Sequence, residues 1–398
     1  MPFTLSEFVN HSTEVARLNG MPALRIQWVW GPTWGRSREQ IRKRTIEGNN
    51  PLTGKPAMAE LVAKLTTPLT DEEKRTGELK RDMGPATFTD THDNLQRLFL
   101  EKRWTDFLPV ILPTEQKVEE MLKGTSHLPD EVLGRMMPVP SSESWSYTVR
   151  TAAINAVMTG CKPEYLPILL AAGSTGLDPI NVADSAWVPS MVINGNIRDE
   201  IGLNYGIGAV GPWAHANTTI GRAWSLLGIN GGNCGKTGTT YMGTVGNPMN
   251  TTNIIIAENE KDSPWEPFSV RRGFKRGQNI VSLFRGWGLI SSKNWKFNDW
   301  STPDNMDFPK IIKDIIDVHD SLFGATAVIC PPIANAIKDA GYGTVEKFVE
   351  WILTPPAGQK PHLRPNQVDI IVTGGSNNNY WSMGALGFNS CVEIDKWR

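Results

Sequence analysis

The apolar positions of residues 306–398 alternate between helical and strand spacing. PKIIKDIIDVHDSLFG repeats its apolar residues every three to four positions and predicts an amphipathic helix, whereas TAVICPP and VDIIVTGG are short apolar runs that predict buried strands. IANAIKDAG and TVEKFVEWIL predict two short helices between these strands. This strand–helix–strand order predicts a parallel crossover, and ligands of such sheets bind beyond the carboxyl ends of the strands.

A second group of predicted helices lies between residues 90 and 175, where the end signals are clear. Thr114 is a suitable N-cap for TEQKVEEMLKG, and Gly160 is a suitable stop for SYTVRTAAINAVMTG. Pro163 fits the first position of the next helix, PEYLPILLAAG. Cys161 is therefore expected close to a helix N-terminus.

The section between Asp178 and Trp300 is rich in Gly, Pro, Asn and Trp, and its dense apolar residues predict ordered loops rather than a linker. Asn217 or Thr218 is expected to cap a helix there, and NIIIAENE and QNIVSLF predict buried strands. The predicted fold class is α/β (mixed α+β), with two closely packed lobes, a loop-rich central region and a C-terminal parallel βαβ element. The predicted parts are an N-terminal extension (1–88), a core (89–305) and a C-terminal α/β lobe (306–398).

Charge and composition narrow the possible partners. The 40 Lys and Arg residues nearly balance 41 Asp and Glu residues, for a net charge of −1, which argues against nucleic acid or an anionic membrane as the main partner. The N-terminus lacks the pattern of a secretory signal, and the four cysteines are widely spaced, so a reduced, cytoplasmic protein is expected. The 15 Trp residues and the small-residue helices favour a homo-oligomer.

Two sequence patterns bear on cofactors. NGGNCGKT resembles a phosphate-binding loop, but Asn230 replaces its first glycine and a predicted helix precedes it, so an ordered loop near a site is the better interpretation. The six histidines show no two-ligand spacing, and no cofactor is predicted. A divalent metal held by scattered residues such as Glu258, His215 and Cys234 stays open as an alternative.

Two positions are candidates for chemistry. A helix dipole and Lys162 favour the thiolate of Cys161, although a buried, inert cysteine fits the sequence equally well. Strand alternation places the carboxylates of Glu258 and Glu260 on one face, where they are suited to acid–base work, to cation binding or to pairing with nearby arginines.

Several longer segments resemble a bacterial family, the UGSC-type (seleno)proteins in their long-chain form. The segments are WTDFLPVILPTEQKVEEML, NAVMTGCKPEYLPILLAA, NGNIRDEIGLN, GAVGPWAHANTTIGRA and AENEKDSPWEPF, within about residues 90–275. The hallmark of that family, selenocysteine or cysteine before G-S-C, is absent here, and the nearest string is TGGSNNN. The resemblance implies that functional residues lie at Asp106, Cys161, Glu164, Asn194, Asn217, Arg222 and Glu258.

These residue types suggest specific roles. Cys161 is expected to act as nucleophile or proton donor, with Asp106 or Glu258 as base. Arg222 is suited to clamping a carboxylate, and Asn194, Asn217 and Glu164 to binding the rest of a substrate. The predictions for Cys161 require that its sulfur face an open cleft.

The expected function is that of an enzyme acting on a small polar or carboxylate-bearing metabolite through cysteine-dependent lyase, hydrolase or transfer chemistry. The alternatives are a metalloenzyme and a non-catalytic metabolite-binding or assembly subunit.

Overall fold

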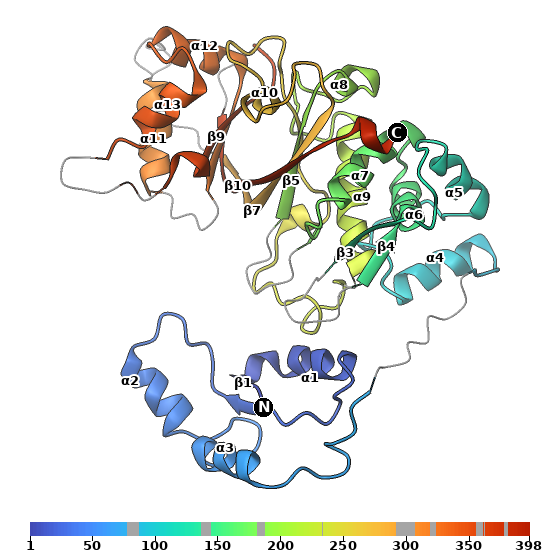
Figure 1. The fold of residues 1–398 in the computed structure, drawn as a ribbon, viewed down its shortest axis with the longest axis vertical. Helices are drawn as coiled ribbons and strands as arrows, with labels where there is room; N and C mark the ends of the chain where they lie inside the picture. The colour runs from blue at the N-terminus through green and yellow to red at the C-terminus, as the bar shows by residue number, and fades with distance from the viewer. Residues whose placement is uncertain are drawn as a thin grey trace.

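The computed structural model shows a mixed α/β fold built on one six-stranded sheet (Figure 1). It describes residues 1–77, 87–136, 145–180, 188–232, 234–291, 307–318, 324–355, 361, 363–377 and 381–398. The six strands of this sheet are β5 (Val188–Asn194), β6 (Ile255–Ala257), β7 (Ile280–Ser291), β8 (Ala325–Ile329), β9 (Val368–Val372) and β10 (Trp381–Glu393). Their order across the sheet is β6-β5-β7-β10-β8-β9.

The sheet consists of two halves with the same strand arrangement. In the first half β5 is parallel to β6 and antiparallel to the long strand β7. In the second half β8 is parallel to β9 and antiparallel to the long strand β10. The two long strands pair antiparallel in the centre and join the halves. The parallel β8–β9 pair confirms the predicted C-terminal crossover, while the core and C-terminal regions share one sheet.

The two edge strands meet at their carboxyl ends, so the sheet is curled. The amide of Asn259, just after β6, donates to the carbonyl of Val372 in β9 at 2.7 Å. The hydroxyl of Thr373 donates to the carbonyl of Ala257 at the same distance. Each strand supplies one residue to a single buried cluster on one face, together with Phe268: Val192, Ile256, Phe284, Val328, Ile371 and Leu386.

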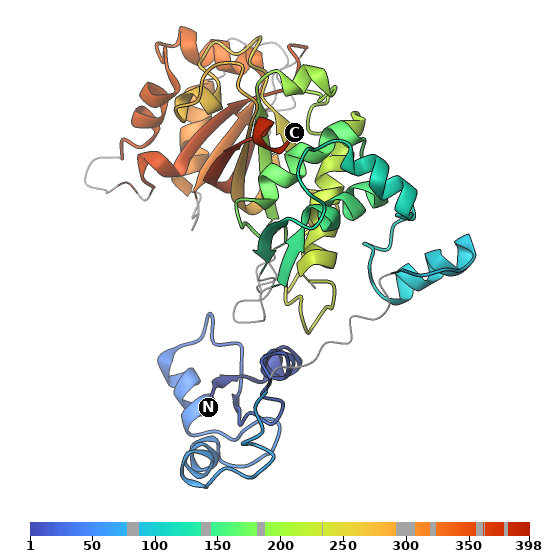
Figure 2. The same cartoon turned by 45° about the vertical axis from the view of Figure 1, so that its right-hand side comes forward.

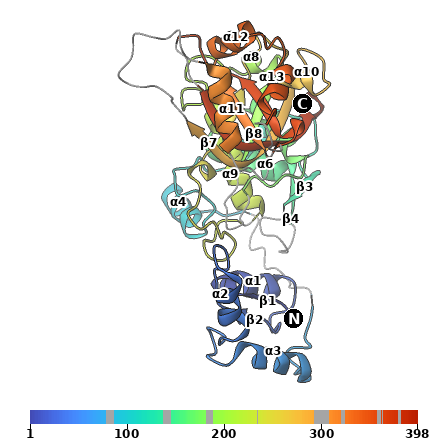
Figure 3. The same cartoon turned by 90° about the vertical axis from the view of Figure 1, so that its left-hand side faces the viewer.

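Two groups of helices cover the other face of the curled sheet, one group on each half. In Figure 1 they lie to the right and to the left of the strands. The first group, α6 (Val149–Thr159), α7 (Leu166–Gly173) and α9 (His215–Gly232), packs on β5, β6 and β7. The second group, α11 (Phe308–Val318), α12 (Pro331–Asp339) and α13 (Val345–Ile352), packs on β8 and β9, and Figure 3 shows α11 and α13 in front of these strands. Strand alternation explains the two faces: Met191 and Ile193 contact helices, whereas Val192 points to the inner cluster.

Most predicted helix ends are confirmed. Thr114 caps α5 (Glu115–Leu122) by accepting from the amide of Lys117, and Gly160 ends α6 in the left-handed region at φ 82°. One expectation was wrong, because α9 begins at His215, and neither Asn217 nor Thr218 is its cap.

The N-terminal residues 1–77 lie apart from the sheet in Figures 1 and 2. The helix α1 (Val9–Leu18) in this part contacts the segment after α9. There the His11 ring Nδ1 lies 2.8 Å from the carbonyl of Thr239. The elements of this part are β1 (Phe3–Leu5), α1 (Val9–Leu18), β2 (Gln27–Val29), α2 (Arg38–Ile41) and α3 (Ala57–Thr66). Further elements are α4 (His92–Glu101), β3 (Val132–Met136), β4 (Trp145–Thr148), α8 (Ile197–Glu200) and α10 (Phe268–Arg271). Among the described residues, no helix is both long and apolar enough to span a membrane.

Candidate functional site

Cys161 lies where the sequence places it, between Gly160 and the short 3-10 helix Pro163–Tyr165, but its thiol is buried. It is 8% exposed and belongs to the apolar cluster of α6 and α7. Burial raises the pKa of this thiol to about 11, and hydrogen bonding to Thr159 and Thr219 offsets only part of the increase. The expectation that the sulfur faces an open cleft as a favoured thiolate is therefore wrong, since desolvation outweighs the helix start.

We expect Cys161 to react slowly with iodoacetamide in the folded protein. A thiol with a pKa of about 11 holds roughly 300-fold less thiolate near neutral pH than an ordinary cysteine. Peptide mass spectrometry after timed labelling at pH 7.5 measures this, with urea-unfolded protein as the control. Labelling of Cys161 as fast in the folded as in the unfolded protein would contradict the buried position.

Asp106 and Arg222, expected as a base and a substrate clamp, bind each other. Arg222, on α9, donates from Nε and Nη2 to the two carboxylate oxygens of Asp106 at 2.9 and 2.8 Å. Its Nη2 also donates to the carbonyl of Pro109. The side chain of Asp106 is only 5% exposed, so this bidentate pair ties the loop after α4 to α9.

Asn217 is also occupied by contacts within the chain. Its Oδ1 accepts from the amide of Asn204 at 2.9 Å, and its Nδ2 donates to the carbonyls of Asn204 and Ile255. These bonds hold the loop after α8 against α9 and β6. The substrate-orienting role expected for Asn217 competes with this structural role.

Three polar residues do converge, at the carboxyl ends of the parallel strands β5 and β6. The side-chain nitrogen Nδ2 of Asn194, the last residue of β5, donates to Glu258 Oε2 at 2.5 Å and to Glu260 Oε1 at 2.9 Å. The two carboxylates thus lie on one side as predicted, but by a tight turn after β6 rather than by strand alternation, because the backbone amide of Glu260 donates to the carbonyl of Glu258 at 3.0 Å. Gly195, in the left-handed region at φ 94°, turns the chain so that its own amide also donates to Glu260 at 2.8 Å.

Arg198 on α8 completes this group, which is hereafter the Glu258 cluster (Asn194, Arg198, Glu258 and Glu260). The guanidinium forms a buried ion pair with Glu260 at 3.3 Å and donates to the backbone carbonyls of Gly195 and Glu258. Glu260 therefore has a cationic partner, whereas Glu258 accepts from the amide of Phe268 at 2.7 Å. The predicted pairing of these glutamates with an arginine holds for Glu260, although the arginine comes from a different segment.

Burial dominates the electrostatics of Glu258, which is 1% exposed. Desolvation raises the pKa of this carboxyl, and the nearby charge of Glu260 raises it further. The charge of Arg271 and the bonds from Asn194 and Phe268 act in the opposite direction. The result is a carboxyl group whose pKa is higher than that of an exposed glutamate, the direction in which enzymes shift carboxyl groups that act as general acids.

Asn194 carries a further signal. Its nitrogen donates to both carboxylates, while its oxygen Oδ1 is buried and has no hydrogen-bond partner among the described residues. A buried polar atom without a partner is costly and is frequent at functional sites. The sequence did not single out Arg198 or Thr373, which hold this cluster in place from α8 and from the end of β9.

The alternative metal set is dispersed. The thiol of Cys234 is buried and donates to the carbonyl of Gly228. His215 lies at the start of α9, with its Nδ1 3.4 Å from the hydroxyl of Tyr165. Within the described part of the chain, no group of three or more His, Cys, Asp or Glu side chains is placed to hold a metal ion.

The glycine-rich segment that resembles a phosphate-binding loop starts inside a helix, because α9 continues through Gly232. The side-chain nitrogen Nδ2 of Asn230 donates to the backbone carbonyl of Trp104 and to Oδ1 of Asn155. This segment therefore packs against the helical layer.

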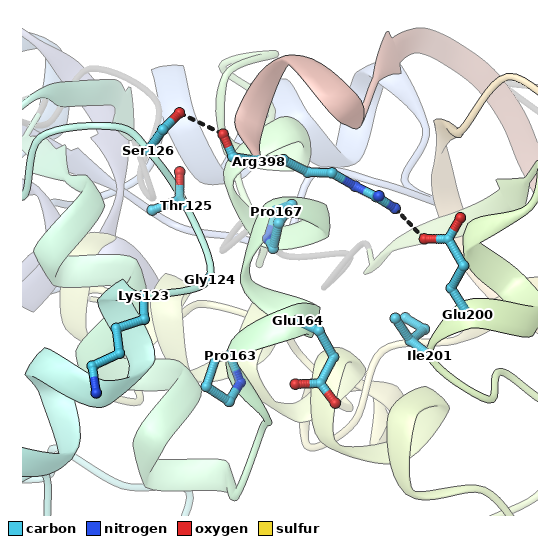
Figure 4. A pocket seen from close by; sticks show the side chains of 10 residues that line it. All are labelled: Lys123, Gly124, Thr125, Ser126, Pro163, Glu164, Pro167, Glu200, Ile201 and Arg398. Carbon is cyan, nitrogen blue, oxygen red and sulfur yellow. Dashed lines mark hydrogen bonds and ion pairs between the residues drawn. The ribbon is translucent and has the colours of Figure 1, made fainter.

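Glu164 is not part of the Glu258 cluster. It lines a surface pocket of about 620 Å³ (Figure 4). Figure 4 shows Lys123, Glu164 and Glu200 around this pocket, with Arg398 extending across it to Glu200. The Glu164 carboxylate is 4.0 Å from the ammonium of Lys162. The structure thus places Glu164 in a surface pocket, outside the hydrogen bonds that join Asn194 to Glu258.

His127 attaches the last residues of the chain to this region. Its ring stacks on Trp397 at 4.5 Å, its Nε2 lies 2.8 Å from the carbonyl of Lys396, and its Nδ1 lies 2.9 Å from Glu131. The bond to the Lys396 carbonyl raises the pKa of His127 most, and Glu131 adds to the increase, against a smaller effect of burial.

This arrangement predicts a pH-dependent stability. The pKa of His127 is higher in the folded than in the unfolded protein. The contribution of protonated His127 to folding stability is therefore complete below its unfolded pKa of about 6.5, and it is lost as the pH rises through its folded pKa. We expect His127→Gln to lose stability relative to the parent at pH 6 and to approach it at pH 8.5, as measured by urea denaturation. A difference independent of pH would show that the ring is neutral in the folded protein.

Comparisons of the chain with protein-family models, with curated proteins and with solved structures find no match.

Proposed function

We propose that this protein is an enzyme that acts on a small polar metabolite and uses Glu258 for proton transfer. The observation that carries the proposal is the position of Glu258, a fully buried carboxyl at the end of β6 whose pKa is raised by burial. Asn194 and the amide of Phe268 fix its orientation at 2.5 and 2.7 Å. Ligands of open α/β sheets bind at such strand ends.

The cysteine-dependent chemistry expected from the sequence has less support. Cys161 is buried among apolar side chains with a raised pKa, and Asp106, its expected base, is engaged by Arg222. Asn194 and Glu258, by contrast, were both implied by the resemblance to the UGSC-type family and lie 2.5 Å apart. The resemblance and the geometry therefore favour the same pair.

The roles of the cluster follow from its contacts. Glu258 takes or delivers a proton, and the side-chain nitrogen of Asn194 orients it. Arg198 forms a buried ion pair with Glu260 and so compensates the charge of the second carboxylate.

The test uses purified full-length protein in D₂O with separate 2-oxo acids, 2-hydroxy acids, amino acids and small amides. Proton NMR then detects both the disappearance of a compound and the exchange of a C–H for deuterium. We expect at least one class to be converted or exchanged in proportion to enzyme concentration. A complete absence of conversion and exchange across the four classes would contradict the proposal and favour a metabolite-binding or assembly subunit.

We also propose that the protein is a homo-oligomer. Exposed tryptophans support this, because Trp34 and Trp213 are 89% and 76% exposed, and large exposed aromatic side chains are enriched at interfaces. Sedimentation at several protein concentrations tests the assembly.

A further inference from the structure

A second pocket, of about 430 Å³, lies between α10 and α13. We name it the α10–α13 pocket; its lining includes Trp265, Glu266, Val270, Arg271, Val345 and Glu346. Its wall from Ser263 to Glu266 belongs to the loop that directly follows the Glu258 cluster. The pocket and the proposed proton-transfer group are therefore built from one continuous segment.

Arg271 is the unusual residue of this pocket. Its Nε donates to the carbonyl of Glu266 at 3.2 Å and its Nη2 to the carbonyl of Ile370 at 2.6 Å. It makes no ion pair with any carboxylate in the described ranges, and its guanidinium lies over the ring of Phe268 at 5.2 Å. Glu258, Asp369 and Glu346 attract the charge of this half-buried guanidinium from beyond ion-pair distance. Burial still lowers the pKa of Arg271, so an anion in direct contact would compensate its charge further.

The other charges around the pocket restrict the ligand. Arg276 is occupied, because it pairs with Glu266 at 2.8 Å where both side chains are more than half exposed. Glu346 adds a second carboxylate to the lining. With Arg276 and Glu266 paired, the lining leaves Arg271 without a carboxylate in direct contact and the unpaired carboxylate of Glu346 nearby, so a single negative charge fits better than a phosphate dianion. Trp265, Val270 and Val345 provide apolar surface for a short carbon chain.

The helix α10 connects this pocket to Glu258. Its first residue, Phe268, donates its amide to Glu258, and its last, Arg271, lines the pocket. Four residues make one helical turn, with a rise of about 5.4 Å. A ligand held at Arg271 is thus about one turn of helix from the amide that orients Glu258.

We propose that the α10–α13 pocket binds a small monocarboxylate, with the carboxylate on Arg271 and the carbon chain on Trp265 and Val345. The inference rests on the proposed function only in taking this ligand to be the substrate. The site itself is tested by binding alone.

Ligand-observed NMR titrations measure the affinity of the protein for propanoate, alanine, inorganic phosphate and the neutral analogue propanamide. We expect propanoate to bind, propanamide to bind at least about tenfold more weakly, and Arg271→Gln to weaken propanoate at least about tenfold. The matched control, Arg276→Gln, removes a charge from the same pocket but one that is already paired, and it is expected to change propanoate binding less than about threefold.

A second variant keeps the test valid if Arg271→Gln does not fold. A Cβ built on Gly343 meets no atom within 4 Å, so Gly343→Leu adds bulk to the lining without disturbing Arg271. Loss of propanoate binding with an unchanged melting temperature supports the site. Unchanged binding in both Arg271→Gln and Gly343→Leu, no binding to the parent protein, or tighter binding of phosphate than of propanoate overturns it.

The two proposals fail in distinguishable ways. Propanoate binding that depends on Arg271, without conversion of any compound in D₂O, removes the proposed enzyme function and keeps the binding site. Conversion that persists at the parental KM in Arg271→Gln keeps the enzyme and removes the α10–α13 pocket as its substrate site.

Discussion

Glu258→Gln is expected to lower turnover of the substrate found in D₂O by about 10²–10⁴-fold, because glutamine cannot exchange a proton. The structural contacts survive the change: the glutamine oxygen can still accept from Asn194 and from the amide of Phe268. KM is expected to change little. Steady-state kinetics by NMR measures the loss, and parental turnover in this variant would eliminate Glu258 as the proton-transfer group.

The stability of the same variant provides an independent check. The folded pKa of Glu258 is raised above its ordinary value of 4.5, so its contribution to stability is complete below pH 4.5 and is lost as the pH rises through the folded pKa. Glutamine does not ionise and avoids this loss. We therefore expect Glu258→Gln to gain stability relative to the parent as the pH increases from about 4.5, as urea denaturation would show. Glu260→Gln is the matched control, and it should lose stability, because it leaves buried Arg198 without its ion-pair partner.

Arg222→Met is expected to destabilise the protein by about 3 kcal/mol, since it leaves the buried carboxylate of Asp106 without its bidentate partner. Methionine fills much of the same volume and isolates the loss of the charge. Urea denaturation followed by circular dichroism gives the free energy of unfolding. Lys310→Met serves as control, because its pair with Asp314 is exposed and should contribute less than about 1 kcal/mol.

The double variant Asp106→Leu/Arg222→Met separates structure from substrate binding. If the pair is structural, removing both charges costs less than Arg222→Met alone, because no unpaired buried charge remains. If Arg222 instead clamps a substrate, as the sequence suggested, Arg222→Met would keep the parental stability and raise KM. Stability measured without ligand therefore distinguishes the two roles.

The two halves of the sheet carry different side chains at the carboxyl ends of their parallel strands. In the first half β5 ends at Asn194, and Glu258 comes directly after β6. In the second half Cys330 comes directly after β8, and Thr373 directly after β9. Thr373 donates to the carbonyl of Ala257, which precedes Glu258, so the second half positions the polar cluster of the first. The two halves thus share a strand pattern but differ at these strand ends, and the second half supports the polar cluster of the first.

Local patterns in the sequence determined the helices, their ends and the parallel β8–β9 crossover. Thr114 and Gly160 act within one or two helical turns, and such short-range rules hold regardless of the rest of the fold. Strand alternation also predicted Glu258 and Glu260 on one side, but both follow the end of β6, and a turn brings them to Asn194.

Only the tertiary structure decided how these elements assemble and which polar groups are free. Asp106 and Arg222 are 116 residues apart, as are Ala257 and Thr373, and no local rule connects them. For Cys161 the helix start was predicted, but the apolar residues that bury the thiol come from α6, α7 and the sheet they cover. Periodicity describes the near neighbours of a side chain, whereas its solvation, and hence its pKa and reactivity, depends on every segment that packs around it.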